Sequence, residues 1–234
     1  MTLRESAAPI PELLSLTTES FTYALEVLAN IDSDLAHILE TLGNPPRWER
    51  ESGFPTLLRI ILEQQVSLAA ANAVFNRLSG VVLSLTPENF IKLGDVQLQE
   101  VGFSRQKMRY CRELADAIVN GRLDLAKLET MDETAIRTEL KRIKGIGDWT
   151  VDIYLLMALK RPDVFPKGDL GIAIAFGAAL PIAIQNIKKL PTRPTPAQIE
   201  VIAQNWRPWR AVATRILWHY YLSNAKRKSV KVDL

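Results

Sequence analysis

Residues 140–150 read LKRIKGIGDWT, and two helical patterns meet in this stretch across Gly145-Ile146-Gly147. A turn this short between two helices needs residues that tolerate positive φ, and glycines without a Cβ let backbone N–H groups approach a phosphate closely. We expect Ile146 to plug the turn into the core and Lys144 to add positive charge beside it. Such a turn would contact a nucleic-acid backbone rather than read its bases. By itself, the stretch fits a tight turn without a ligand equally well.

The segments on both sides of this turn have the spacing of amphipathic helices, and strand-like alternation is scarce. The pattern predicts helices over residues 28–42 (one helix, or a pair capped near Asp32 or Ser33), 55–78, 87 onward, 105–120, 132–144, 148–160 and 196 onward. The last of these begins with a capping box, Thr195 and Gln198, and can break at Pro208. The sequence therefore predicts an all-α fold.

The composition limits the classes of site that the chain can hold. The formal net charge is +3 and the pI is about 9.0, which permits an anionic partner without requiring one. With one cysteine, Cys111, the chain can form no intramolecular disulfide, Cys-rich zinc site or four-cysteine iron–sulfur cluster. No apolar run approaches the ~20 residues that span a bilayer, and the start of the chain lacks a secretory signal. We expect no metal site, no membrane association and an intracellular location, in the cytoplasm and nucleoid or in a nucleus.

The helix lengths suggest two helical lobes. We expect residues 1–50 and 195–234 to combine into one lobe and residues 51–194 to form a central bundle, with a cleft between the lobes. The bundle would contain a helical hairpin at about residues 133–160 and a Pro- and Gly-containing loop at residues 161–170.

An aspartate, Asp169, follows Trp149 by 20 residues and lies at the end of that loop. Taken together, Gly145–Thr150, Asp163–Pro166 and Asp169-Leu170 resemble the helix-hairpin-helix DNA glycosylase superfamily, and more narrowly its 3-methyladenine DNA glycosylase II branch. Further matches follow in the expected order over about residues 45–220, namely Gln64–Ser67, Gly102–Lys107, Trp206–Arg210 and Leu217-Trp218.

The resemblance implies a base excision repair enzyme that flips an alkylated purine, such as 3-methyladenine, out of the duplex and hydrolyses its N-glycosidic bond. It assigns the catalytic role to Asp169, whose carboxylate would stabilise positive charge at C1′ as the base departs. Asp169 also precedes an apolar helical pattern, so an N-cap is its simpler interpretation, and the two roles can coexist. The chain departs from the family at Gly168, where many relatives carry a second acidic residue.

The resemblance also implies residues that bind the substrate. Gln65 matches the side chain that fills the vacated base stack, although a solvent-facing turn of a helix explains it without the family. A cationic base attracts aromatic rings, and the matching rings are Trp149, Trp218 and, more weakly, Tyr154, for which core packing is the better interpretation. The hairpin residues expected to contact DNA are Lys144, Gly145, Ile146, Gly147 and Thr150.

Trp149 stands where relatives that also cleave the DNA strand place a lysine that forms a Schiff base. We therefore expect a monofunctional hydrolase without lyase activity. No cofactor is required, and the backbone carbonyls of Lys141, Ile143 and Ile146 can hold a monovalent cation, as in relatives. We expect a monomer that acts on double-stranded DNA containing damaged bases, without an iron–sulfur cluster or an extra N-terminal sheet domain.

Three alternatives stay open. The hairpin alone would account for a noncatalytic helix-hairpin-helix DNA-binding protein, although the spacing to Asp169 argues against it. A glycosylase for oxidised or mismatched bases would share most of the motifs. A helical scaffold without a nucleic-acid role is the third.

Overall fold

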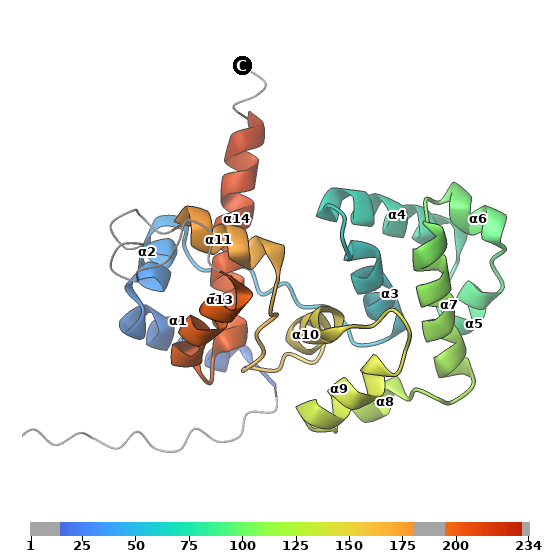
Figure 1. Cartoon of the computed structure of the whole chain (residues 1–234), viewed down its shortest axis with the longest axis horizontal. Helices are drawn as coiled ribbons and strands as arrows, with labels where there is room; N and C mark the ends of the chain where they lie inside the picture. Colours follow the sequence, from blue (N-terminus) through green and yellow to red (C-terminus); the bar gives the residue numbers. More distant parts are fainter. Residues whose placement is uncertain (1–14, 180–194, 231–234) are drawn as a thin grey trace, which may run out of the picture. The chain divides into compact units, whose positions relative to one another are not determined.

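The computed structural model of the chain describes residues 15–179 and 195–230, and every regular element in these ranges is a helix (Figure 1). The all-α prediction is therefore confirmed. The chain divides into two units. The central unit comprises Arg47–Leu159 and Pro166–Asp169, and the terminal unit comprises Met1–Pro46, Lys160–Phe165 and Leu170–Leu234. Within the described ranges, no helix combines the length and apolar character needed to cross a membrane.

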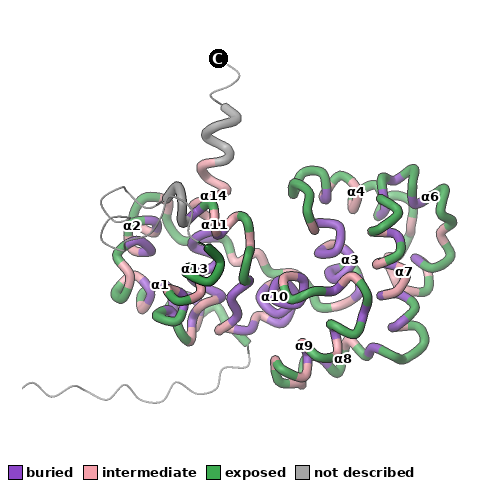
Figure 2. The backbone as a smooth tube through the Cα atoms, viewed as in Figure 1, coloured by how far each residue is buried: buried purple, intermediate pink, exposed green. Residues whose placement is uncertain are grey.

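The central unit is built around two helices that are buried on most sides, α3 (Phe54–Glu63) and α10 (Asp148–Met157) (Figure 2). A helix that is apolar on most faces, as α10 is, is stable only inside a core. Helix α3 packs against α4 (Leu68–Val81), α7 (Arg105–Val119) and α10. Helix α9 (Glu133–Lys141) packs against α10, and together they form the expected hairpin.

Short helices complete this unit. They are α5 (Pro87–Ile91), α6 (Asp95–Glu100) and α8 (Leu125–Leu128). Ser104 caps α7 by accepting from the backbone N–H of Lys107, and Asp132 caps α9 by accepting from that of Ala135. Helices α6 and α8 were not predicted, because elements of one or two turns show too little periodicity to recognise.

The single helix expected over residues 55–78 is wrong, because α3 ends at Glu63 and α4 begins at Leu68. Between them, Gln65 has φ +58, a left-handed conformation that cannot continue a right-handed helix. Ser67 then caps α4 by accepting from the N–H of Ala70 at 3.2 Å. Apolar residues continue at helical spacing across this break, so the periodicity concealed it. The available signal was Ser67, a capping residue directly before an apolar run.

The terminal unit contains α1 (Thr18–Ile31), α2 (Ser33–Leu42), α11 (Leu170–Ala179), α13 (Pro196–Ala203), the 3₁₀ turn η1 (Gln204–Trp206) and α14 (Arg210–Val230). Helix α14 packs against α1, α2 and α11. Asp32 separates α1 from α2 and caps α2, and its Oδ2 accepts from Trp206 Nε1 at 2.9 Å. The expected pair of helices and the capping box at Thr195 are confirmed.

The observed division of the chain differs from the expected one in the placement of α11. The sequence assigned residues 51–194 to the central bundle, whereas α11 lies with the terminal unit. The reason is packing, since α11 buries Ile172 and Ala175 and makes its main contact with α14. The loop that leads to Asp169 therefore begins in the terminal unit and ends in the central unit.

Candidate active site

The hairpin turn, residues 142–147, imposes different demands on its two glycines. Gly145 has φ +98, and a Cβ built on it would lie 2.2 Å from Cγ of Tyr110 on α7, so backbone and packing both exclude a side chain. Gly147 has an ordinary φ of −104, and nothing lies within 4 Å of the position that its Cβ would take. It is the N-cap of α10, whose first-turn N–H groups have no acceptor within the helix. The turn thus combines a rigid closure with an uncrowded helix N-terminus.

The side chains of the hairpin sort into an inner and an outer set. Ile146 is 5% exposed, and its N–H donates to Ile143 O at 3.0 Å, which confirms the expected plug. Thr150 is also buried and faces the interior of the unit. Lys144 and Gly147 are exposed. Any ligand of the turn would meet the outer pair, while Ile146 and Thr150 hold the turn in place from inside.

One cation of the hairpin is already neutralised within the protein. Lys141 Nζ donates to Asp148 Oδ1 at 2.6 Å across the turn, and this bond lowers the pKa of Asp148 below its usual value. The exposed Lys144 ammonium makes no hydrogen bond or ion pair with the part of the chain that the structure describes. Arg142 of the turn pairs with Glu139 at 2.8 Å, so the unpaired positive charge that the hairpin turn offers to an anion is that of Lys144.

An ion pair with a buried carboxylate joins the two helices of the hairpin. Arg137 Nη2 on α9 lies 2.6 Å from Asp152 Oδ1 on α10, and the Asp152 residue is 3% exposed. Burial raises the pKa of Asp152 to about 6, although the charge and hydrogen bond of Arg137 oppose the shift. The sequence did not single out this pair, because a carboxylate inside an apolar helix gives no sign of its partner.

Asp169 stands at the end of a tight turn. Its N–H donates to Pro166 O at 3.3 Å, and Gly168, with φ +74, supplies the left-handed residue that such a turn needs. The departure from the family at Gly168 thus has a local role in the backbone. Helix α11 begins directly after Asp169, and the residue itself is half-buried.

Trp149 holds the carboxylate of Asp169. The indole Nε1 of Trp149 donates to Asp169 Oδ2 at 2.9 Å, and both residues belong to the central unit. Trp149 lies in the first turn of α10, two residues after Gly147, so one helix carries both the hairpin turn and the partner of the carboxylate. An oriented, half-buried carboxylate can stabilise a positive charge that develops beside it.

The other end of the loop is fixed within the terminal unit. Asp163 accepts from Arg210 Nε at 2.6 Å and Nη2 at 3.0 Å, and from Arg207 Nη1 at 2.8 Å. Arg210 also donates to the backbone carbonyl of Asp163. The matched segments Asp163–Pro166 and Trp206–Arg210 therefore meet in space, with an anchoring role.

The wedge turn, residues 64–67 between α3 and α4, presents Gln65 on the surface. Gln65 is exposed, in the left-handed conformation described above, and the side chains of Val66 and Leu68 beside it are exposed as well. Gln64 is half-buried, and its Nε2 donates to Gly145 O at 2.9 Å and to Thr150 Oγ1 at 2.8 Å. Sequence reasoning identified Gln65 and missed Gln64, although both interrupt the same apolar run.

The two remaining aromatic candidates differ in their surroundings. Tyr154 is fully buried, its hydroxyl accepts from the N–H of Gly53 at 3.1 Å, and burial raises its pKa to about 12. It is a core residue, the interpretation that the sequence favoured. Trp218 is half-buried on α14 in the terminal unit.

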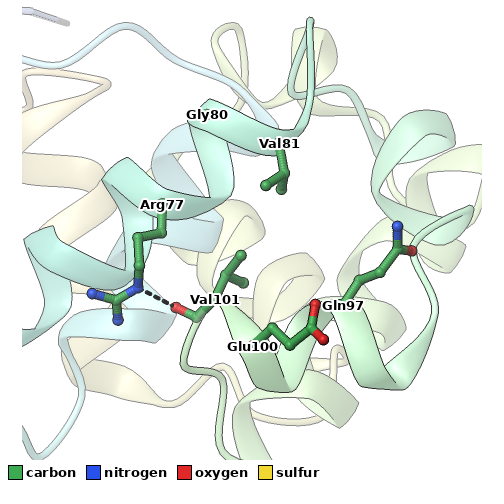
Figure 3. Close-up of a pocket in the computed structure, with 6 residues that line it drawn as sticks. All are labelled: Arg77, Gly80, Val81, Gln97, Glu100 and Val101. Atoms are coloured by element: carbon green, nitrogen blue, oxygen red, sulfur yellow. Dashed lines mark hydrogen bonds between the residues drawn. The ribbon is translucent and has the colours of Figure 1, made fainter.

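A hollow between α4 and α6 contains none of these residues. It is lined by Arg77, Gly80, Val81, Gln97, Glu100 and Val101 (Figure 3). Arg77 Nε donates to Val101 O at 2.9 Å and so supports the turn before α7. Across residues 15–179 and 195–230, no three His, Cys, Asp or Glu side chains are grouped so that they could hold a metal. The candidate site is therefore built from the hairpin turn, the wedge turn and Asp169.

Known proteins resemble this chain in sequence and in fold. The sequence profile of the HhH-GPD superfamily of base excision DNA repair proteins matches residues 58–208. DNA-3-methyladenine glycosylase 1 of Schizosaccharomyces pombe is 29% identical over 206 residues, which cover 85% of this chain and 87% of the relative. The solved structure of an S. pombe 3-methyladenine DNA glycosylase in complex with abasic DNA has a TM-score of 0.73 at 28% identity, covering 84% of this chain and 95% of that one. A DNA-3-methyladenine glycosidase from Bacillus halodurans has a TM-score of 0.67 at 27% identity, covering 87% and 91%.

Proposed function

Because the chain belongs to the HhH-GPD superfamily of base excision DNA repair proteins, we propose that it is a DNA glycosylase that releases alkylated purines, such as 3-methyladenine, from duplex DNA. The observation that carries this proposal is the 2.9 Å hydrogen bond from Trp149 Nε1 to Asp169 Oδ2. It connects a carboxylate to the helix that starts at the hairpin turn. One helix thereby links the contact with the DNA backbone to the group that assists the reaction.

The hairpin turn would hold the strand that carries the damaged base. The N–H groups of the first turn of α10 and the ammonium of Lys144 would bind a phosphate without regard to sequence. The wedge turn would insert the side chain of Gln65 into the stack as the base leaves it. A glutamine amide both fills volume and offers hydrogen bonds to the base left unpaired.

Asp169 would act on the sugar. The bond from C1′ to the base nitrogen breaks, its electron pair leaves with the base, and a water oxygen bonds to C1′ as the water loses a proton to solvent. Positive charge develops at C1′ in this step, and the Asp169 carboxylate stabilises it. An alkylated purine is already cationic, so it departs without a strong general acid. The N–H of Trp149 keeps the carboxylate in one orientation, which reduces the reorganisation that the reaction requires.

We propose that the ring of Trp149 contacts the flipped base, whereas Tyr154 contributes to the core. Trp149 has no amine with which to form a Schiff base, so the enzyme would be monofunctional. Its product would be an intact strand with an abasic site, which alkali then cleaves. Gel electrophoresis of an end-labelled product before and after alkali treatment measures this directly, and cleavage before alkali would contradict the proposal.

We also propose that the protein acts as a monomer inside the cell and requires no cofactor. A monovalent cation fits the end of α9, because Lys141 O accepts from no backbone N–H in the described part of the chain and the end of a helix carries negative partial charge. Ile143 O and Ile146 O would complete that site. The reaction does not depend on it.

Two variants test the role assigned to the carboxylate. Duplex DNA treated with dimethyl sulfate serves as substrate, and free 3-methyladenine is measured by chromatography. Asp169→Asn should slow release by at least about 100-fold, because it removes the charge that stabilises C1′. Trp149→Phe keeps a ring but removes the N–H donor, and should slow release about 10-fold, the usual effect of a hydrogen bond to a charged group.

Asp116→Asn is the matched control, because it neutralises an exposed aspartate on α7 that pairs with Arg122 on the surface. It should release base at the wild-type rate. Unchanged release in Asp169→Asn would remove this residue from the mechanism. Wild-type protein that binds the methylated duplex and releases nothing would instead favour a noncatalytic DNA-binding protein, and release of oxidised bases alone would favour another glycosylase branch.

A further inference from the structure

Within the described part of the chain, the side chain of Gln64 alone hydrogen-bonds from the wedge turn to the hairpin turn. Its Nε2 donates to Gly145 O at 2.9 Å and to Thr150 Oγ1 at 2.8 Å, 81 and 86 residues further along the chain. Gly145 O lies in the hairpin turn itself, and Thr150 lies in the first turn of α10. A single amide group therefore fixes the end of α3 to both the turn and the helix that follows it.

The residues before Gln65 are held from other sides as well. Lys107 Nζ on α7 donates to Leu62 O. The buried carboxylate of Glu63 accepts two bonds from the guanidinium of Arg50, at 2.7 and 3.1 Å. Burial lowers the pKa of Lys107, yet its hydrogen bond gives the C-terminal end of α3 a donor that the helix lacks. Gln65 thus adopts its left-handed φ of +58 at the end of a helix that is fixed at three consecutive residues.

A strained residue persists only where its surroundings determine its conformation, and such residues cluster at functional sites. We infer that Gln64 is a positioning residue that fixes the wedge Gln65 at a set distance from the phosphate-binding hairpin turn. The inference rests on the proposed function. Eversion of a base requires one strand to be gripped while a side chain enters the stack, and both events succeed only if the two turns are held in register before DNA binds.

The test compares two forms of one substrate. A radiolabelled strand whose one purine is 3-methyladenine is annealed to a complement with or without the opposing thymine. The base in the paired duplex must be displaced from its stack, whereas the bulged base is already unpaired and depends less on a wedge. The ratio of the two single-turnover release rates therefore reports on the wedge, which general damage to the fold would not change.

Gln64→Leu removes the donor at similar volume. It should slow release from the paired duplex about 10-fold and from the bulged duplex by less than about threefold, because a misplaced wedge slows the reaction mainly where the base must be displaced. The affinity for an undamaged duplex should stay unchanged. Thr150→Val removes one acceptor and should change the ratio in the same direction, with the double variant no worse than Gln64→Leu. Thr150→Ser keeps the hydroxyl and should have the same ratio of release rates as the wild-type protein.

If Gln64→Leu left the ratio of the two release rates unchanged, whether or not both rates fell, the inference would be overturned and Gln64 would have a purely structural role. Thermal unfolding of each variant separates these outcomes from a failure to fold, and Thr150→Val supplies a second, milder variant. Wild-type protein that releases no base from either duplex would defeat the proposed function itself, and the inference would fall with it.

Discussion

Two turns of the central unit reach a left-handed backbone by opposite means. In the hairpin turn, Gly145 has φ +98 and no side chain. In the wedge turn, Gln65 has φ +58 and carries a complete side chain on the surface. The left-handed region costs an L-residue about 1–2 kcal/mol, a cost that glycine avoids. The wedge turn therefore retains strain that the hairpin turn does not.

The difference follows from what each turn has to present. In the proposed function a phosphate approaches the uncrowded backbone at Gly147, and Gly145 closes the turn against Tyr110, so neither position can carry a side chain. A turn that enters a base stack must expose a side chain, so a glycine there would remove the function together with the strain. The contacts of Leu62, Glu63 and Gln64 with the rest of the unit compensate for the conformation of Gln65. Under the proposed function, strain is thus tolerated where the side chain itself would enter the base stack.

The largest expected effect separates the two glycines of the hairpin turn. Gly145→Ala should lower the free energy of unfolding by about 3–4 kcal/mol. The alanine would have to adopt a left-handed backbone conformation, and its Cβ would overlap the ring of Tyr110. Gly147→Ala should change it by less than about 1 kcal/mol, since its backbone is extended and its surroundings are open. Urea unfolding of both variants measures the contrast.

Affinity for duplex DNA should show the reverse order, since among folded molecules Gly147→Ala should lose more affinity than Gly145→Ala. The Cβ of Gly147→Ala would stand where a phosphate approaches, so its affinity for an undamaged duplex should fall although its stability does not. Lys144→Ala serves as the comparison, since it should reduce the dependence of log affinity on log salt by about 0.9, the loss of one phosphate contact. Equal free energies of unfolding for Gly145→Ala and Gly147→Ala would contradict the different roles of the two glycines.

A second contrast concerns how the hairpin is held together. Its helices share the buried pair Arg137–Asp152, and the pKa of Asp152 is about 6 in the folded protein against about 3.9 in an unfolded chain. The folded state therefore binds more protons between pH 4 and 6. The stability contributed by the neutral carboxyl is fully present below pH 4 and is lost as the pH rises through 6.

Asp152→Asn cannot ionise and should not lose this contribution. The unfolding free energy of Asp152→Asn relative to wild type should therefore rise by about 2 kcal/mol between pH 4 and pH 7. Urea unfolding at half-unit pH intervals checks this. Parallel stability curves for the two proteins would mean that Asp152 titrates normally and that Arg137 fully compensates for its burial.

The contrast between the turns also explains what the sequence could predict. Gly145 and Gly147 indicated the hairpin turn, because glycine is a local signal of unusual backbone, and Asp169 was assigned from the resemblance to the glycosylase family. The wedge turn was hidden, since Gln65 is not a residue type associated with positive φ and the apolar spacing runs through it. Three contacts join residues that the sequence pattern does not relate, and only packing brings them together. They are Gln64 with Gly145, Tyr110 with Gly145, and Arg137 with Asp152. The sequence did not predict the hydrogen bond from Trp149 Nε1 to Asp169 either. The role expected for Trp149 was stacking of its ring on the base, which does not involve the N–H group.

The smallest expected effect bears most directly on the comparison, because it exchanges the solutions used by the two turns. Gln65→Gly and Gln65→Ala both remove the wedge, and both should slow release of 3-methyladenine from paired DNA about 10-fold. Their stabilities should differ, with Gln65→Gly more stable than Gln65→Ala by about 1 kcal/mol, because only alanine retains the left-handed strain. Urea unfolding resolves that difference. If the glycine variant proved less stable, the backbone at Gln65 would not be strained, and the contacts around Gln64 would need another explanation.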